Sequence, residues 1–302
     1  ISALCAPMRY KGQAVGVLRV YTGQAHTFDW FETSLLRSIA VQAAAAIDHA
    51  RLDEEAARAA EIRHQIEMAG EVQRRMMPQR PPEVANLELG AVHVPSLAVA
   101  GDFYDFIELP GGRLAVAVCD VAGKGMRASL LMASIRAMLR SCAAAAGDVS
   151  RAVETVNRQL CADTLTADFA TLFYAVFDPP TRRVTYVNAG HVPPLLVRDG
   201  QFCHLTTGGM ILGIVPDRSW GSESFTLHAG DVVAIYTDGL SEALNFADEP
   251  FGRERVEKAI RTAIEAGYDA EGIAKQCLWD MRRFAGLQTR FDDTTIVAMR
   301  VR

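Results

Sequence analysis

One segment constrains the fold of this chain most. It is an apolar run that ends in an aspartate and is followed by a glycine-rich turn and a long helical pattern. The run is Val116-Ala-Val-Cys, and the aspartate is Asp120. The turn Ala-Gly-Lys-Gly follows, and apolar residues then recur at helical spacing over Arg127–Ala145. Aspartate is a poor strand residue, and a charge at the end of an apolar strand is costly unless it is solvated or neutralised. The segment therefore predicts a strand–turn–helix unit that presents one carboxylate at the strand end.

Three further segments place aspartates at strand ends or sharp turns. Asp102 lies in Gly-Asp-Phe-Tyr-Asp-Phe, Asp238 follows the apolar run Val232–Thr237, and Asp292 and Asp293 precede an apolar run to Val301. Either Asp-Gly or Asp-x-x-Gly alone is explained as a simple turn. Four such segments together favour a shared site, because Mg²⁺ and Mn²⁺ prefer oxygen ligands. Two such ions can activate a water and take up charge on a phosphoryl group.

The pattern from Leu87 onward predicts an α+β domain. Many of the expected strands are joined by short turns, so we expect antiparallel sheets packed together with helices outside. The expected strands are Leu87–Val94, Arg113–Cys119, Phe169–Phe177, Arg183–Val187, Pro194–Val197, Gln201–Leu205, Phe225–Leu227, Val232–Tyr236 and Thr294–Val301. The expected helices are Arg127–Ala145, Val149–Leu165, Arg253–Ala266 and Asp269–Phe284.

The first part of the chain predicts a hairpin and a long helix. Residues 1–24 form two strand-like pieces around a Lys-Gly turn, and Thr27-Phe-Asp-Trp-Phe-Glu indicates a helix entry capped by Thr or Asp. From Asp48 to Met77 there is no proline, and apolar residues recur every three, four or seven positions. This helix is either a parallel coiled-coil linker, which would make a homodimer, or a helix that packs back onto its own chain. Three prolines end it between Pro78 and Pro82.

Residues Pro7 to Ile47 resemble the C-terminal end of a GAF sensory domain in their last strands and final helix. The ligand-binding half of such a domain is absent, so no ligand is inferred. We accordingly divide the chain into a remnant of a GAF-like sensor (residues 1–50), a helical linker (51–86) and a catalytic domain (87–302). Because the first residue is Ile, we expect the sequence to be a piece of a longer protein.

From about residue 68 to 302 the chain resembles the PPM-type metal-dependent serine/threonine phosphatases, closest to the SpoIIE-like and sigma-factor-regulating branch. The resemblance implies an αββα sandwich, two antiparallel sheets flanked by helices, with two Mn²⁺ or Mg²⁺ ions at one edge. The matching stretches occur in the family's order: Ile66–Pro78, Gly101–Phe106, Asp120–Ala133, Phe169–Tyr174, Asn188–Pro194, Gly230–Glu242 and Asp292–Val297.

The resemblance also implies roles for individual residues. Asp120 matches the aspartate that bridges both ions, and the Val121 carbonyl matches a direct ligand. Asp238 matches a ligand of the second ion, while Asp102 matches an acid that acts through water. At the last motif we prefer Asp292 as ligand, with Asp293 at the family's Asn position. The family's Asp-Gly-His motif is Asp120-Val-Ala here, so the general acid is unassigned.

Four neighbouring residue types allow two interpretations each. His191, in Asn-Ala-Gly-His-Val-Pro-Pro, is a candidate acid or a side chain that holds its loop. Lys124 contacts substrate phosphate or faces solvent. Gly123 and Gly125 cradle phosphate on their amides or permit the sharp turn beside the site. Glu242 is a solvated or loop-fixing residue near Asp238.

Charge and composition exclude several classes. The formal net charge is −5 with scattered Lys and Arg, which argues against nucleic acid as partner. The six cysteines form no CxxC pair, and the seven histidines form no zinc motif, so we expect reduced thiols in a cytoplasmic protein. No apolar run approaches the roughly 18–20 residues of a membrane helix, and we expect no membrane association.

The combined prediction is a metal-dependent phosphatase that removes phosphate from serine or threonine of a partner protein by direct attack of activated water. By resemblance, the partner is an anti-sigma-factor antagonist of STAS type. The sensor end would control activity through the linker by moving the helix after Asp120. The alternatives are a pseudo-phosphatase acting as a dimeric signalling scaffold, and an enzyme that hydrolyses a small phosphoester; no adenine or ribose motif supports the latter.

Overall fold

The computed structural model describes residues 1–164, 168–288 and 292–302 and divides into two compact units, Ile1–Gln65 and Ile66–Arg302. The boundary differs from the one we expected at residue 87. Gln73 and Met77 are each only 6% exposed within the second unit, so the end of the long helix belongs to the second unit's core.

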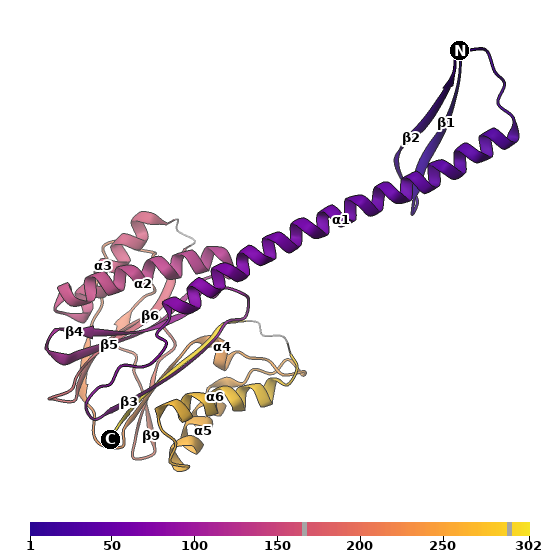
Figure 1. Ribbon diagram of the computed structural model, residues 1–302. Coiled ribbons are helices and arrows are strands. Elements are labelled where there is room, and N and C mark those ends of the chain that lie inside the picture. The colour runs from indigo at the N-terminus through magenta and orange to yellow at the C-terminus, as the bar shows by residue number, and fades with distance from the viewer. Residues whose placement is uncertain (165–167, 289–291) are drawn as a thin grey trace. The chain divides into compact units, whose positions relative to one another are not determined.

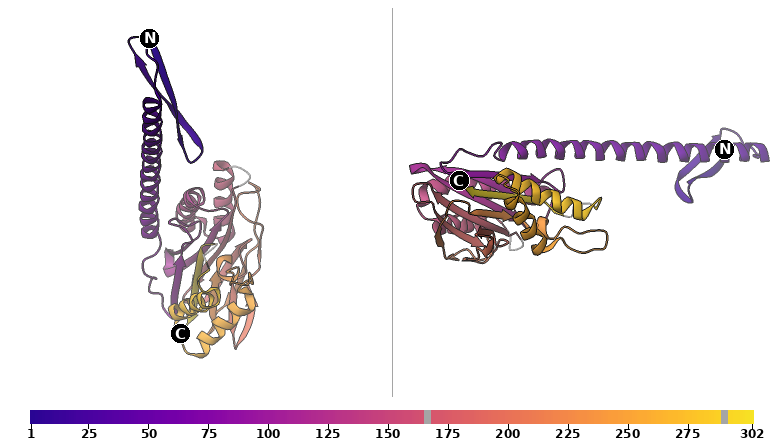
Figure 2. Two further views of the ribbon diagram at one scale, coloured as in Figure 1. Left: turned by 90° about the vertical axis from the view of Figure 1, so that its right-hand side faces the viewer. Right: turned by 90° about the horizontal axis from the view of Figure 1, so that it is seen from below.

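The first unit is a β-hairpin beside a helix. Strands β1 (Ser2–Tyr10) and β2 (Gln13–Thr22) pair antiparallel, and the turn residues Lys11 and Gly12 both have positive φ. That conformation matches the right-handed twist of hairpin strands, and it confirms the predicted Lys-Gly turn. Figure 2 shows the hairpin alongside the first half of α1, where buried Ala6, Leu36 and Ala40 form a small apolar cluster.

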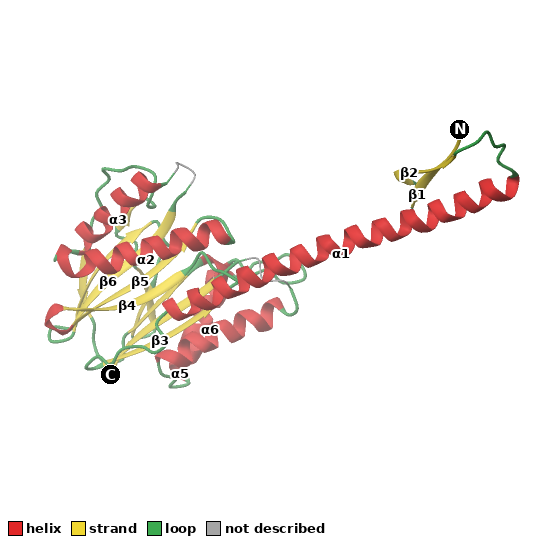
Figure 3. Cartoon of the chain, turned by 45° about the horizontal axis from the view of Figure 1, so that its top comes forward, coloured by secondary structure: helices red, strands yellow, loops and turns green. Residues whose placement is uncertain are grey.

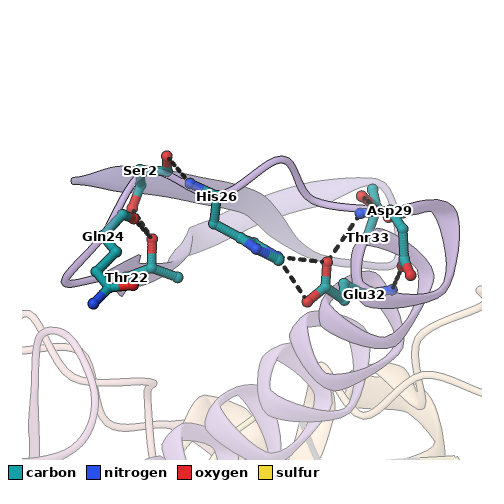
Figure 4. A network of polar contacts seen from close by, with 7 residues as sticks. All are labelled: Ser2, Thr22, Gln24, His26, Asp29, Glu32 and Thr33. Carbon is teal, nitrogen blue, oxygen red and sulfur yellow. Dashed lines mark hydrogen bonds and ion pairs between the residues drawn. The ribbon is translucent and has the colours of Figure 1, made fainter.

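A reciprocal pair of hydrogen bonds begins helix α1 (Figure 4). The Asp29 carboxylate accepts from the Glu32 backbone N–H at 2.7 Å, and the Glu32 carboxylate accepts from the Asp29 N–H at 2.9 Å. This capping box satisfies two backbone donors that the first helical turn leaves unpaired. His26 also contacts Glu32, at 3.0 Å. Asp29, one of the two capping residue types expected from sequence, is therefore the cap.

Helix α1 (Trp30–Met76) is a single helix of 47 residues. Between residues 30 and 65 several of its large apolar side chains are exposed, including Leu35, Ile39, Leu52 and Ile62. Charged residues separate them, and within the described part of the chain no helix is long and apolar enough to span a bilayer.

The second unit contains two sheets (Figures 1 and 3). The first has the order β10-β7-β6-β5-β4, with β11 also paired to β7, and the second has the order β3-β13-β12-β8-β9. All pairings are antiparallel except the two-residue parallel contact of β10 with β7. The strands are β3 (Leu87–Val94), β4 (Phe103–Leu109), β5 (Arg113–Val121), β6 (Ala170–Asp178), β7 (Arg183–Ala189), β8 (Leu195–Arg198), β9 (Gln201–His204), β10 (Gly208–Gly209), β11 (Glu223–Thr226), β12 (Val232–Tyr236) and β13 (Thr294–Val301).

Alternation along the strands creates three apolar layers. On β5, Val116 and Val118 face the second sheet, while Ala117 and Cys119 face helices α2 (Met126–Ala146) and α3 (Val149–Asp163). On β12, Val233 and Ile235 face the first sheet, and the alternate residues Val232, Ala234 and Tyr236 face helices α5 (Gly252–Glu265) and α6 (Ala270–Ala285). Figure 3 shows these helix pairs on opposite outer faces. The predicted αββα sandwich is confirmed.

Strand β4 was missing from the sequence-based assignment. Its pattern Phe-Tyr-Asp-Phe-Ile-Glu-Leu contains Asp105, which is fully buried, and two arginines of α2 pair with that carboxylate. Helix α4 (Asp238–Ser241) was also not predicted, being a single turn. The helix expected to end at Leu165 ends at Asp163, and Leu165 itself lies outside the described residues.

Candidate metal centre

Asp120 lies at the end of β5, opposite Thr171 of β6. Gly123 (φ 94°) and Gly125 (φ 75°) then turn the chain sharply into α2, conformations that only glycine adopts readily. The loop that carries Asp102 packs closely against this turn. A Cβ on Gly101 would lie only 3.0 Å from the Val121 carbonyl oxygen and 3.2 Å from the Ala128 side chain. The positive φ values of Gly123 and Gly125 agree with the turn-forming interpretation, while the phosphate-cradling interpretation stays a prediction.

Asp102 lies just before β4 and is 2% exposed. Its Oδ2 accepts hydrogen bonds from the hydroxyls of Thr237 at 2.7 Å and Thr295 at 2.9 Å. Burial, and then the nearby charge of Asp120, raises the pKa of Asp102 well above its usual range. Neither threonine was singled out from sequence, although Thr237 directly precedes Asp238 and Thr295 closely follows Asp293.

Asp120 and Asp238 lie in a common negative field. Burial raises the pKa of Asp120 to about 7, reinforced by the charges of Asp238 and Asp292. Burial also raises the pKa of Asp238, with contributions from Glu242 and Asp292. Because these side chains come from β5, α4 and the segment just before β13, the fold brings together carboxylates that lie far apart in the sequence. Repulsion among them favours any group that supplies positive charge.

The two neighbouring aspartates before β13 face different partners. Asp293 Oδ1 accepts from the backbone N–H of Ser96 at 2.7 Å and from its hydroxyl at 2.9 Å, and Oδ2 accepts from the Gly101 N–H at 2.7 Å. This carboxylate thus holds the loop that carries Asp102. The side chain of Asp292 is 44% exposed, and its Oδ2 lies 3.0 Å from Lys124 Nζ.

The backbone of the turn after Asp238 packs tightly against the backbone of Asp293. A Cβ on Gly239 would lie 1.9 Å from the Asp293 carbonyl oxygen, so only glycine fits after Asp238. The hydroxyl of Thr294 also donates to the Gly239 carbonyl at 3.4 Å. The start of α4 is thereby held against the start of β13, and Asp238 is held beside Asp292.

His191 is a loop-holding residue in this structure. It is 4% exposed, its backbone N–H donates to Asn188 Oδ1 at 2.7 Å, and its Nδ1 lies 2.8 Å from the Thr171 hydroxyl. Burial lowers the pKa of His191 to about 4, which favours the neutral imidazole at ordinary pH. Glu242 is exposed and acts on the site through its charge near Asp238.

The oxygen donors of these aspartates suit a hard divalent cation such as Mg²⁺ or Mn²⁺. Within the described residues no three His, Cys, Asp or Glu side chains are arranged to hold an ion by themselves. Mg²⁺ and Mn²⁺ characteristically keep several waters and use few carboxylates, so they fit a loose cluster of aspartates better than metals that need a closed protein cage. Burial, reinforced by the charges of Asp238 and Asp292, raises the pKa of Asp120, and a bound cation would relieve both effects.

Comparison with known proteins places this architecture in a class. The SiaA-PP2C domain of Pseudomonas aeruginosa superposes with a TM-score of 0.69 at 21% identity, covering 82% of this chain and 100% of that one. Phosphoserine phosphatase RsbU of Bacillus subtilis is 27% identical over 245 residues, 80% of this chain and 71% of RsbU. Protein IcfG of a Synechocystis strain is 28% identical over 267 residues, 78% of this chain but only 41% of IcfG.

The fold, with its four acidic segments, defines a PP2C-type serine/threonine phosphatase domain. Residues 110–302, more than half of the chain, match the family described as stage II sporulation protein E (SpoIIE). The chain belongs to that family.

Proposed function

We propose that this chain is a phosphoprotein phosphatase that uses two Mn²⁺ or Mg²⁺ ions, with an anti-sigma-factor antagonist of STAS type as its partner. The observation that carries the proposal is the packing of the acidic segments against one another: Thr237 and Thr295 donate to Asp102, and the Asp238–Gly239 turn lies against Asp292. Asp120 is close enough for the charges of Asp238 and Asp292 to act on it. RsbU, which aligns over most of this chain, is a phosphoserine phosphatase. The partner and the number of ions rest on the family resemblance.

In this proposal Asp120, Asp238 and Asp292, with the Val121 carbonyl, hold the ions, and Asp102 contributes through water. When bound, the ions supply an activated water and positive charge for the phosphoryl group. The hydroxyls of Thr237 and Thr295 fix the rotamer of Asp102, and Asp293 fixes the loop that carries it. Lys124 lies within 3.0 Å of Asp292, where an ammonium can also meet substrate phosphate. No acid is assigned, so water protonates the leaving oxygen of the serine or threonine.

Metal addition provides the direct test. We expect the metal-stripped full chain to release no phosphate from a phosphoserine protein or from p-nitrophenyl phosphate, and to become active on addition of Mn²⁺ or Mg²⁺. The melting temperature should also rise with the ion, because binding to the folded state alone is stabilising. Release that is indifferent to EDTA would contradict the proposal. An active centre that accepts only p-nitrophenyl phosphate would favour a small phosphoester, and no release at all would favour the scaffold.

We further propose that the N-terminal unit controls the site through α1. The helix runs without a break into the second unit, and buried Gln73 there contacts both the Asp102 loop and α2. Its side-chain amide donates to the Ala100 carbonyl at 2.8 Å and to the Ser129 hydroxyl at 3.0 Å, and its oxygen accepts from the Ala100 N–H at 2.7 Å. A shift of α1 would therefore act on the two segments that carry Asp102 and follow Asp120.

Close packing supports the same coupling. A Cβ on Gly70 would lie 2.1 Å from the Ala98 carbonyl oxygen, so α1 contacts the loop before Asp102 backbone to backbone. The exposed apolar side chains of α1 between residues 30 and 65 are the surface through which we propose that two copies pair as a coiled coil.

We expect Gln73→Leu in the full chain to lower kcat/KM by about tenfold. The leucine leaves the buried N–H and C=O of Ala100 without partners, which costs about 1–3 kcal/mol and loosens the loop before Asp102. Gln65→Leu, on an exposed position of the same helix, is the matched control and should leave activity unchanged. The measurement is Mn²⁺-dependent turnover, with sedimentation to record the oligomeric state. Equal activity of both variants would count against control through α1.

A further inference from the structure

A pocket of about 480 Å³ lies directly beside the carboxylate cluster. Gly239 and Asp292 contribute to its wall, as does Glu242. The opposite walls come from the C-terminal part of α6 and from the loop between α4 and α5. Its volume lies in the range typical of ligand sites, about 300–1,000 Å³. Most of the residues that line it have no role in the proposed metal centre.

The loop wall of the pocket is held by its own hydrogen bonds. The Phe251 N–H donates to the Ala243 carbonyl at 2.8 Å, and the Asn245 N–H donates to the Glu249 carbonyl at 3.0 Å. The Gln288 amide, beyond the end of α6, donates to the Asn245 carbonyl at 3.2 Å. The loop is therefore tied both to itself and to the segment after α6, so the pocket is largely formed before anything enters it.

The lining decides what can enter. Leu244, Met281 and Ala285 give it apolar walls, and the charged side chains of its described lining, Glu242 and Asp292, are both acidic. An apolar side chain, which needs no counter-charge and gains by leaving water, fits.

The rim extends this apolar surface. Phe246, at the tip of the loop, is 71% exposed and lies against Gly286, where an added Cβ would be 3.1 Å from its ring. Leu287, the next residue, is 94% exposed. Large exposed apolar side chains at the mouth of a pocket are typical of surfaces that meet a protein partner.

We propose that this pocket is a specificity subsite that receives an apolar side chain of the substrate protein, close in sequence to its phosphorylated serine or threonine. The inference rests on the proposed phosphatase function. In an extended segment, side chains two residues apart lie on the same side and about 6.5–7 Å apart. A phosphoserine at the carboxylate cluster therefore places such a neighbour over the adjoining pocket.

Synthetic phosphoserine peptides test the proposal on the unmodified full chain with Mn²⁺. The peptides carry leucine, alanine or aspartate two residues before or two residues after the phosphoserine and are otherwise identical. We expect kcat/KM to fall in the order leucine, alanine, aspartate for one of the two positions, with leucine at least about tenfold above alanine. Equal rates for all peptides would overturn the proposal.

Filling the pocket provides the second arm. Ala285→Trp should reduce the leucine preference to less than about threefold, and Ala266→Trp, the same change at an exposed site on the C-terminal cap of α5, should preserve it. An unchanged preference in Ala285→Trp would overturn the assignment. So would a change in oligomeric state with an unchanged preference, which would assign the pocket to a second copy. Wild-type turnover of p-nitrophenyl phosphate is the control for the phosphatase function itself. If the chain is not a phosphatase, this turnover is absent; if only the subsite is wrong, this turnover persists.

Discussion

Replacing Asp120 by asparagine is expected to lower metal-dependent phosphate release by about a hundred- to a thousandfold, the loss seen when one group that stabilises developing charge is removed. Asparagine keeps the size of the side chain but removes the charge at the point where the carboxylates converge. Asp238→Asn should have a comparable effect, because burial and repulsion place Asp238 in the same field. The measurement is Mn²⁺-dependent turnover of p-nitrophenyl phosphate and of a phosphoserine protein.

Asp199→Asn is the matched control for this experiment. Asp199 is exposed and has a φ of 49°, a conformation that asparagine tolerates well, so folding and activity should be unchanged. In the same assay Asp292→Asn should lose activity with little change in melting temperature, whereas Asp293→Ala should lower the melting temperature because three donors lose their acceptor. Turnover that survives both Asp120→Asn and Asp238→Asn would refute the metal assignment.

The largest expected effect on stability comes from Asp105 of β4. This carboxylate is fully buried and receives Arg140 through Nε at 2.6 Å and Nη2 at 2.7 Å, while Arg136 Nε lies 3.0 Å away. Asp105→Ala leaves two guanidinium groups without their counter-charge, and Arg136 is mostly buried. Breaking a buried ion pair from one side costs about 3–5 kcal/mol. For a unit of this size we expect the melting temperature to fall by roughly 6–20 °C.

A compensating variant tests the cause. Asp105→Leu combined with Arg136→Met removes most of the buried charge, and it should recover a large part of the stability lost in Asp105→Ala. Asp178→Ala, on the partly exposed end of β6, serves as control and should change the melting temperature little. A melting temperature for Asp105→Ala within about 2 °C of wild type would show that the pair does not hold α2 to the sheet, since about 1 kcal/mol shifts it by 2–4 °C.

Most helices and strands could be predicted from the sequence because short-range patterns, namely apolar periodicity and turn residues, determine them. Strand β3 was predicted at its observed bounds, Leu87–Val94, and the bounds of α2 and α5 differ from the prediction by one residue at each end. Strand β4 was missed because Asp105 looks unfavourable in a strand. Only the arginines of α2, thirty-one and thirty-five positions later, make that burial acceptable.

For the site, too, some features could be predicted from the sequence and others required the tertiary structure. The sequence identified the acidic segments, because an aspartate at the end of an apolar strand demands a partner that the local chain does not supply. The preference for Asp292 over Asp293 as ligand came from the sequence and stays a prediction. The structure adds that Asp293 accepts hydrogen bonds from Ser96 and Gly101, whereas Asp292 lies beside Lys124. His191 allowed two interpretations in sequence, a candidate acid or a side chain that holds its loop, and only the structure shows it buried, with its backbone bonded to Asn188 and its ring beside Thr171.

The sequence by itself thus determined the kind of protein: its family, its sandwich of sheets and helices, and the acidic segments that we propose as its metal centre. Periodicity, turns and strand-end charges are local properties, and short segments carry them completely. The tertiary structure alone decided which threonines orient Asp102, how Gln73 joins α1 to the site, and that a pocket opens beside Asp292. These depend on contacts between segments far apart in the chain, whose distances no local pattern encodes.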